Sequence, residues 1–180
     1  MSDISFKVVV FGDGGVGKTT LINRYTTGVF SESTTITIGV DFYVKKIEIE
    51  GIHVSLQLWD FMGEDRFRVL LPGFVIGAEG GLFIYDITRY SSFKNITTWT
   101  SVFKECIDES ERPIPLLLVG SKIDLASFRA VDSFYGKKLA EQKEQFKTYI
   151  ECSSKTGKNV DLIFTTLARE MLKREGMIKK

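Results

Sequence analysis

The residues from Gly12 to Thr19 read G-D-G-G-V-G-K-T and fit the pattern G-x-x-x-x-G-K-[ST]. Glycines let a backbone wrap a diphosphate with its N–H groups pointing inward, and the N-terminus of a following helix adds a favourable dipole. In such a loop the lysine bridges the β- and γ-phosphates, and the threonine hydroxyl holds Mg²⁺. We therefore predict a nucleoside-triphosphate site whose loop residues are Gly14, Gly15, Val16, Gly17, Lys18, Thr19 and Thr20.

A second cluster, Trp59-Asp60-Phe61-Met62-Gly63, follows an alternating strand pattern. At the end of a strand, the Asp60 carboxylate can hold magnesium through a water molecule. Gly63 has no side chain, so its backbone N–H can approach a γ-phosphate closely. The pattern D-x-x-G is short, and its place after a strand gives it most of its value. It predicts that Asp60 and Thr19 share the metal.

Two further clusters point to the base of the nucleotide. Asp124, in S-K-I-D, follows an apolar run, and a carboxylate at the C-terminal end of a parallel strand lies at the ligand edge of the sheet. Its oxygens can accept from guanine N1–H and N2, whereas adenine would leave them unpaired at a cost of about 1–3 kcal/mol. In E-C-S-S-K, a backbone N–H can reach guanine O6 and the Lys155 stem can lie against the base. The predicted contacts are Ser121, Lys122, Asp124, Ser153, Ser154 and Lys155.

The elements that must position these clusters can be read from hydrophobic periodicity. Nearly continuous apolar runs at 8–11, 82–85 and 116–119 are typical of strands buried on both faces of a parallel sheet. Residues 42–49 and 54–58 are joined by so short a connection that they must form an antiparallel hairpin. Apolar residues at helical spacing predict helices over 93–107 and 160–171, the second with Asn159 as its N-cap. The pattern favours a doubly wound α/β domain with one antiparallel strand pair.

The composition excludes several classes of protein. The chain has 180 residues, which is about one domain, with 43% hydrophobic and 26% charged residues. Its net charge of +1 does not suit a protein that coats nucleic acid. We find no signal-peptide pattern and no apolar run long enough for a membrane span. Cys106 and Cys152 have no metal-binding spacing and are predicted to be free thiols in a cytoplasmic protein.

The motifs GDGGVGKT, TIGVDF, LQLWD, GEDRF, YDIT, SKID and ECSSK resemble, in this order and spacing, the small GTPases of the Ras superfamily. TIGVDF and YDIT are specifically similar to the Rab branch. The resemblance covers residue 5 to about residue 173. It implies a P-loop NTPase fold over residues 1–180, a Ras-like G domain with a six-stranded, mostly parallel sheet, one antiparallel strand and about five helices. It also implies a monomeric molecular switch that binds GTP or GDP with Mg²⁺.

The same resemblance assigns roles to individual residues. In the GTP form Thr37 would join Thr19 on Mg²⁺, and hydrolysis would release the loops that carry Thr37 and Gly63. Phe30 would pack against guanine. The family's catalytic residues correspond to Lys18, Thr37, Gly63 and position 64. Effectors, activating proteins and exchange proteins would bind at Ile38, Phe42, Trp59 and Phe74, although ordinary core packing also explains the three aromatic residues.

The sequence departs from the family where catalysis is expected. Rab proteins typically read W-D-T-A-G-Q-E, but this chain has Phe61 and Met62 for the two small residues and Glu64 for the glutamine that orients water. No arginine lies between Phe30 and Thr37, where a catalytic arginine in cis could contribute about 10³–10⁵ in rate. An ionised Glu64 would repel an anionic γ-phosphate. We therefore expect slow hydrolysis, with Glu64 acting as a protonated donor or as a weak base.

Other interpretations remain open at this point. Ser121 replaces the usual asparagine or threonine, and its shorter side chain suggests somewhat weaker nucleotide affinity. The tail from about residue 174 is basic and has no cysteine for prenylation, so it predicts a solvated segment or weak attraction to a peripheral, anionic membrane. A GTP-binding scaffold that does not hydrolyse is one alternative function. A P-loop kinase for a small molecule is another, and Asp124 and Thr37 argue against it.

Overall fold

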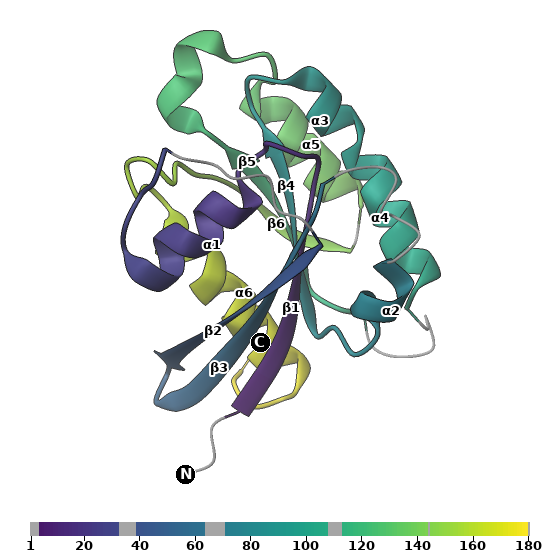
Figure 1. Ribbon diagram of the computed structural model, residues 1–180. Coiled ribbons are helices and arrows are strands. Elements are labelled where there is room, and N and C mark those ends of the chain that lie inside the picture. The colour runs from purple at the N-terminus through teal and green to yellow at the C-terminus, as the bar shows by residue number, and fades with distance from the viewer. Residues whose placement is uncertain (1–3, 33–38, 64–70, 108–112, 144, 180) are drawn as a thin grey trace.

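The computed structural model describes residues 4–32, 39–63, 71–107, 113–143 and 145–179. In this part of the chain a six-stranded sheet has the order β2-β3-β1-β4-β5-β6 (Figure 1). Only β2 and β3 pair in antiparallel fashion among the described strands, and the other neighbours are parallel. The sequence prediction of a mostly parallel sheet is confirmed. The strands are β1 (Ile4–Phe11), β2 (Val40–Ile49), β3 (Ile52–Phe61), β4 (Gly80–Asp86), β5 (Leu116–Ser121) and β6 (Phe146–Glu151).

The β2–β3 hairpin turns at Glu50 and Gly51, which both have positive φ, 52° and 80°. This combination is the one that a two-residue type I′ turn requires, and its twist matches that of the flanking strands. The register pairs Ile49 with Ile52 and Val40 with Phe61. The hairpin therefore runs the whole length of β3 and carries its end to the ligand edge of the sheet.

Helices cover both faces of the sheet (Figure 1). Six α-helices are described, against about five predicted, because the predicted helix over 93–107 is divided at Asn95. The backbone of Asn95 stays close to helical geometry, so this division is slight. The helices are α1 (Lys18–Thr27), α2 (Leu71–Val75), α3 (Tyr90–Lys94), α4 (Ile96–Glu105), α5 (Ser133–Gln142) and α6 (Val160–Arg174), with a 3₁₀ helix at Ile123–Phe128.

The central strands are buried on both faces because each face has its own core. Val8 and Val10 pack in the cluster that includes α1 and α6, whereas Val9 and Phe11 pack in the cluster beneath α2, α3, α4 and α5. Successive side chains of a strand point to opposite faces, so both must be apolar here. This explains the continuous apolar runs, and it holds the end of β1 rigidly at the start of the phosphate loop.

Two details of the last helix differ from the sequence prediction. Asn159 precedes α6, but its backbone is left-handed and its side chain donates to Glu151 O (2.7 Å) instead of capping the helix. After α6, Gly176 adopts φ 72°, and Ile178 packs partly against the core. The segment predicted as a solvated tail is therefore partly folded back, because a left-handed glycine reverses the chain at the end of a helix.

Candidate functional site

The phosphate loop joins β1 to α1 and has the geometry that its glycines predict. Gly12, Gly15 and Gly17 have φ of 142°, 74° and 99°, in the region that favours glycine. A Cβ at Gly12 would lie 2.1 Å from Ile84 O on the neighbouring strand. The loop therefore starts in close backbone contact with β4, and no larger residue fits there.

Lys18 lies inside the loop with only 6% of its surface exposed. Its Nζ donates to Gly12 O and to Asp13 O, both at 2.9 Å. Burial lowers the pKa of Lys18 to about 8, although the charges of Asp60 and Asp13 oppose this effect. The loop thus surrounds the Lys18 ammonium group, and a bound anion such as a phosphate would stabilise the charged form of this lysine.

Thr19 and Asp60 meet beside Lys18. The Thr19 hydroxyl donates to Asp60 Oδ2, and Asp60 is fully buried at the end of β3. Burial raises the pKa of Asp60 to about 6, while the Thr19 hydrogen bond and the charge of Lys18 act in the opposite direction. Asp60 Oδ1 is buried and has no hydrogen-bond partner in the described part of the chain. A hydroxyl and a carboxylate with a free lone pair fit Mg²⁺, which takes few protein ligands and completes its shell with phosphate and water.

Gly63 lies directly against the phosphate loop. Its carbonyl accepts from Gly14 N–H at 2.8 Å, and a Cβ at Gly63 would lie 2.2 Å from Gly14 N. The approach of these two backbones requires glycine at position 63, whereas the sequence analysis predicted glycine there for an approach to a γ-phosphate. Just before it, Phe61 is buried and stacks on Phe11 with a centroid distance of 5.2 Å. The large residue at position 61 therefore anchors the segment in the core.

Ser121 and Lys122 tie the base-binding segment to the phosphate loop. Ser121 Oγ lies 2.6 Å from Val16 O and 2.9 Å from Tyr85 O. Lys122 Nζ donates to Gly15 O at 2.7 Å and pairs with Asp86 Oδ2 at 2.7 Å. Ser121 thus reaches the loop backbone, so its short side chain serves to join two segments of the site.

Asp124 and Ser153 come together although they are far apart in sequence. Ser153 is fully buried, and its hydroxyl donates to Asp124 Oδ1 at 2.6 Å. Ser153 Oγ in turn accepts from Thr156 N–H at 3.1 Å. This chain of hydrogen bonds orients the exposed Asp124 carboxylate, as recognition of a base edge requires.

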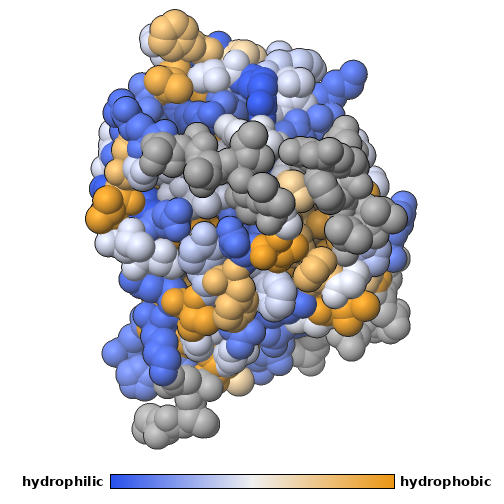
Figure 2. All heavy atoms as spheres, in the orientation of Figure 1, coloured by the Kyte–Doolittle hydropathy of each residue, from blue (hydrophilic) through white to orange (hydrophobic). Residues whose placement is uncertain are grey.

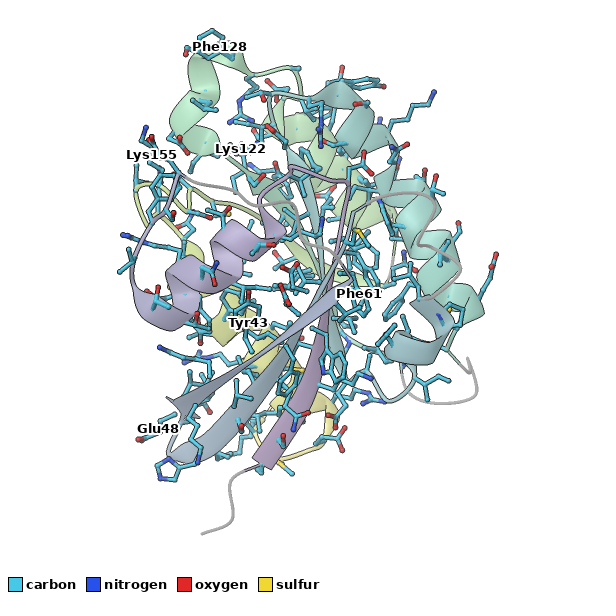
Figure 3. All side chains as sticks on the ribbon, viewed as in Figure 1. Tyr43, Glu48, Phe61, Lys122, Phe128 and Lys155 are labelled. Carbon is cyan, nitrogen blue, oxygen red and sulfur yellow. The ribbon has the colours of Figure 1, made fainter. Side chains whose placement is uncertain are left out.

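Lys155 lies on the outer side of the segment that carries Ser153 and is largely exposed. Its Nζ lies 3.5 Å from Glu32 Oε1, and Phe30 is partly buried two residues before Glu32. Lys122 and Lys155 lie near the same end of the sheet, and Glu48 lies at the opposite end (Figure 3). Thus three segments, one with Phe30 and Glu32, one with Lys122 and Asp124, and one with Ser153 and Lys155, come together near one edge of the sheet. Thr20 lies in the first turn of α1 and Ser154 follows Ser153.

A hydrogen-bonded network lies behind the Glu151–Lys155 segment. Arg129 binds both carboxylate oxygens of Glu151, at 2.7 Å and 3.0 Å. Tyr149 donates its hydroxyl proton to Glu151 Oε1 at 2.7 Å, so Tyr85, whose hydroxyl is 2.6 Å from that of Tyr149, must be the donor to Tyr149. Burial alone would raise the pKa of Glu151, but the hydrogen bonds from Arg129 and Tyr149 outweigh it and hold the pKa below its usual value.

The three aromatic residues predicted to bind partners form one group. Phe42 is half exposed, and its ring meets the Trp59 ring edge to face with a centroid distance of 5.2 Å. The Phe74 ring lies beside the Trp59 ring with a centroid distance of 6.1 Å. Trp59 and Phe74 are partly buried. Figure 2 shows hydrophobic residues gathered over the face that β2 and β3 cross. Phe42 is thus exposed at the surface, whereas Trp59 and Phe74 also pack against the core.

Some predicted residues lie outside the described ones, and some described residues were missed. Thr37, Ile38 and Glu64 belong to the first group. The sequence analysis gave Asp86 of the YDIT motif no role. Its place at the end of a strand was a usable signal, because Asp86 lies opposite Ser121 in the sheet. Trp99 was interpreted only as an apolar helix position, yet a buried indole N–H needs an acceptor.

Comparison with known proteins places this geometry in a family. The model of the Ras family matches residues 7–173, which is nearly the whole chain. The chain belongs to the Ras family. It is similar to Rab proteins, being 41% identical to human Ras-related protein Rab-26 over 96% of its own length and 40% identical to Ras-related protein Rab-1 of Theileria parva over 94%.

Within the Ras family, this chain is shorter than its relatives. It spans 66% of human Rab-26, 75% of Theileria parva Rab-1 and 76% of human Rab-37, to which it is 38% identical. The family is one of GTPases that bind GTP or GDP with Mg²⁺ and act through effectors and regulators. Among the described residues, no helix is both long enough and apolar enough to cross a membrane. No group of three or more His, Cys, Asp or Glu side chains that could hold a metal ion occurs there either.

Proposed function

We propose that this chain binds GTP and GDP with Mg²⁺ and acts as a Rab-like switch whose intrinsic hydrolysis is slow. The observation that carries the proposal is the meeting of three segments at one edge of the sheet. Lys18 supplies a buried ammonium group, Thr19 and Asp60 supply oxygen donors, and Asp124 is oriented by Ser153. A triphosphate, a magnesium ion and a guanine base each match one of these segments.

In this function each residue has a defined task. Lys18 would neutralise the β- and γ-phosphates, and Thr19 and Asp60, together with Thr37 in the GTP form, would hold Mg²⁺. Burial of Lys18 and Asp60 would strengthen the electrostatic interactions of both groups. Gly63 offers its N–H to the γ-phosphate. The bound ion supplies charge neutralisation where negative charge develops during phosphoryl transfer.

Slow hydrolysis is inferred from position 64. The family uses a neutral glutamine there to orient water, and Glu64 would instead bring a second negative charge toward the γ-phosphate. The outer contacts of the switch are proposed to be Ile38, Phe42, Trp59 and Phe74, which would meet effectors, activating proteins and exchange proteins. A single, monomeric domain over residues 1–180 is sufficient for all of these tasks.

A second candidate function is a GTP-binding interaction module that does not hydrolyse. The observation that favours it is the burial of Phe61 and Met62, which are 2% and 7% exposed. Met62 N–H also donates to Gly39 O at 3.1 Å. These contacts hold the start of the segment before Glu64 in one place, whereas the two small residues typical of Rab proteins cannot fill the core in this way.

Single-turnover conversion of preloaded GTP to GDP with Mg²⁺ tests both functions. We would compare the wild type with Glu64→Gln and use Glu48→Gln, the same chemical change at the far end of the β2–β3 hairpin, as a control (Figure 3). Slow turnover that rises in Glu64→Gln alone supports the switch. GTP retained without conversion in all three proteins supports the interaction module. Failure of the wild type to load GTP overturns both.

A further inference from the structure

The segment that follows β4 touches the phosphate loop from its outer side. Trp99 Nε1–H donates to Asp13 Oδ1 at 2.8 Å, and Asn95 Nδ2 donates to Asp13 Oδ2 at 2.8 Å. Arg89 donates from its guanidinium to Gly14 O at 2.7 Å. Three donors from one short stretch of chain thus bind two consecutive residues of the loop.

These donors are themselves held in place by packing. Trp99 is 1% exposed and stacks near Phe11 with a centroid distance of 6.2 Å. Asn95 is the junction between α3 and α4, and its N–H donates to Ser91 O at 3.0 Å. The acceptor is fixed equally well, because each oxygen of the Asp13 carboxylate has its own donor. The position of residue 13 is therefore set by the α3–α4 junction and not by the flexible glycines around it.

The inner side of the same two residues faces the phosphate site. Asp13 O accepts from Lys18 Nζ at 2.9 Å, and Gly14 N–H donates to Gly63 O at 2.8 Å. Residues 13 and 14 thus stand between the helices on one side and the site on the other. A displacement at the α3–α4 junction moves the backbone that surrounds Lys18.

We propose that Asp13, Asn95, Trp99 and Arg89 form a clasp that positions the phosphate loop and sets how long a nucleotide stays bound. The inference rests on the proposed binding of guanine nucleotides. A loop of glycines that is ordered only on binding loses conformational entropy at that step, and a loop already held by the clasp loses less. These are positioning residues, because they act through the backbone of residues 13 and 14. The clasp also makes the α3–α4 junction a point from which nucleotide release is controlled.

The test exploits the chemistry of the Asp13–Asn95 pair. Asp13→Asn removes the charge and leaves one acceptor oxygen for the two donors, Asn95 and Trp99, and Asn95→Asp places a carboxylate opposite the Asp13 carboxylate, so each single change weakens the contact. Made together, the two changes again place an amide opposite a carboxylate, with an oxygen still available to Trp99. Asp132→Asn is the control, since the Asp132 side chain accepts from Phe134 N–H at 2.8 Å, at the N-terminus of α5 and away from the loop.

The measured quantities are the dissociation rates of fluorescent GDP and GTP analogues and the thermal midpoint of each loaded protein. We expect each single variant to release both nucleotides about tenfold faster, which corresponds to one charge-assisted hydrogen bond. The combined variant should return to within about threefold of the wild type, and Asp132→Asn should stay at the wild-type rate. A destabilised but passive contact would lower the thermal midpoint and leave the dissociation rates unchanged.

Unchanged dissociation in both single variants, or no recovery in the combined variant, would overturn the clasp while leaving nucleotide binding intact. If Asp13→Asn does not fold, the dissociation rates of Asn95→Ala alone test the clasp, because Asn95 is only partly buried at the helix junction and its replacement should be tolerated. Wild-type protein that binds no guanine nucleotide would instead contradict the proposed function. The two failures are therefore distinguishable.

Discussion

Replacing Gly63 with alanine would put a methyl group into space that the phosphate loop already fills. The new Cβ would lie 2.2 Å from Gly14 N, 2.3 Å from Asp13 C and 2.6 Å from Lys18 Nζ. The first two are backbone atoms of residues that hydrogen bonds hold on their outer side, so the loop cannot retreat easily. The residues before Gly63 must shift instead, and the hydrogen bond from Gly14 N–H to Gly63 O must lengthen or break.

The size of the effect follows from these distances. Ordinary Cβ contacts begin near 3.4 Å, so the required displacement at Gly14 is on the order of 1 Å. A misplacement of about 1 Å in a catalytic site can lower a rate by about 10²-fold. The lost hydrogen bond is worth a further ~0.5–1.5 kcal/mol. Under the proposed function, we expect GTP hydrolysis in Gly63→Ala to fall by about 10- to 100-fold.

Single-turnover hydrolysis and amide hydrogen exchange at Gly14 measure the two parts of this prediction. Gly73→Ala is the control, because a Cβ at this position in α2 meets no atom within 4 Å. Alanine is also favoured over glycine in a helix by about 0.5–1 kcal/mol. The reasoning is refuted if Gly63→Ala hydrolyses GTP at the wild-type rate with its Gly14 amide still protected, or if Gly73→Ala loses as much activity.

Two further predictions concern stability, and urea unfolding at a fixed nucleotide concentration measures both. Gly12→Ala would place an alanine at φ 142° with its Cβ 2.1 Å from Ile84 O. The free energy of unfolding should therefore fall by about 2–4 kcal/mol, and an unfolding midpoint equal to that of the wild type would contradict this prediction. Arg129 and Tyr149 hold the pKa of Glu151 below its unfolded value of about 4.3. The ionised Glu151 therefore contributes fully to the free energy of unfolding above that pH, and the contribution is lost as the pH falls through the folded pKa. Glu151→Gln should therefore unfold with a weaker acid dependence than the wild type, and parallel curves would exclude Glu151 as a source.

Local patterns in the sequence were enough to predict the sheet and most helices, and they indicated the candidate site residues. Runs such as 8–11 and 116–119 are apolar at every position, which only strands covered on both faces require. G-x-x-x-x-G-K-T, Asp60 with Gly63, and Asp124 were recognised because each is a local pattern that serves one kind of chemistry. The β2–β3 hairpin followed from the length of its connection. These features depend on neighbours in the chain, so one sequence was sufficient to predict them.

Which polar groups meet across the fold could not be predicted from the sequence. Periodicity assigned Trp99 to the core, but it could not indicate that the indole N–H reaches Asp13, 86 residues away. Ser121 was predicted as a shortened base contact, whereas its hydroxyl lies 2.6 Å from Val16 O. The pKa of Lys18 is lowered by burial, which hydrophobic spacing does not specify for a lysine. Hydrogen-bond partners and burial depend on how strands and helices are placed in space, and hydrophobic spacing specifies the faces of an element but not what its polar atoms touch.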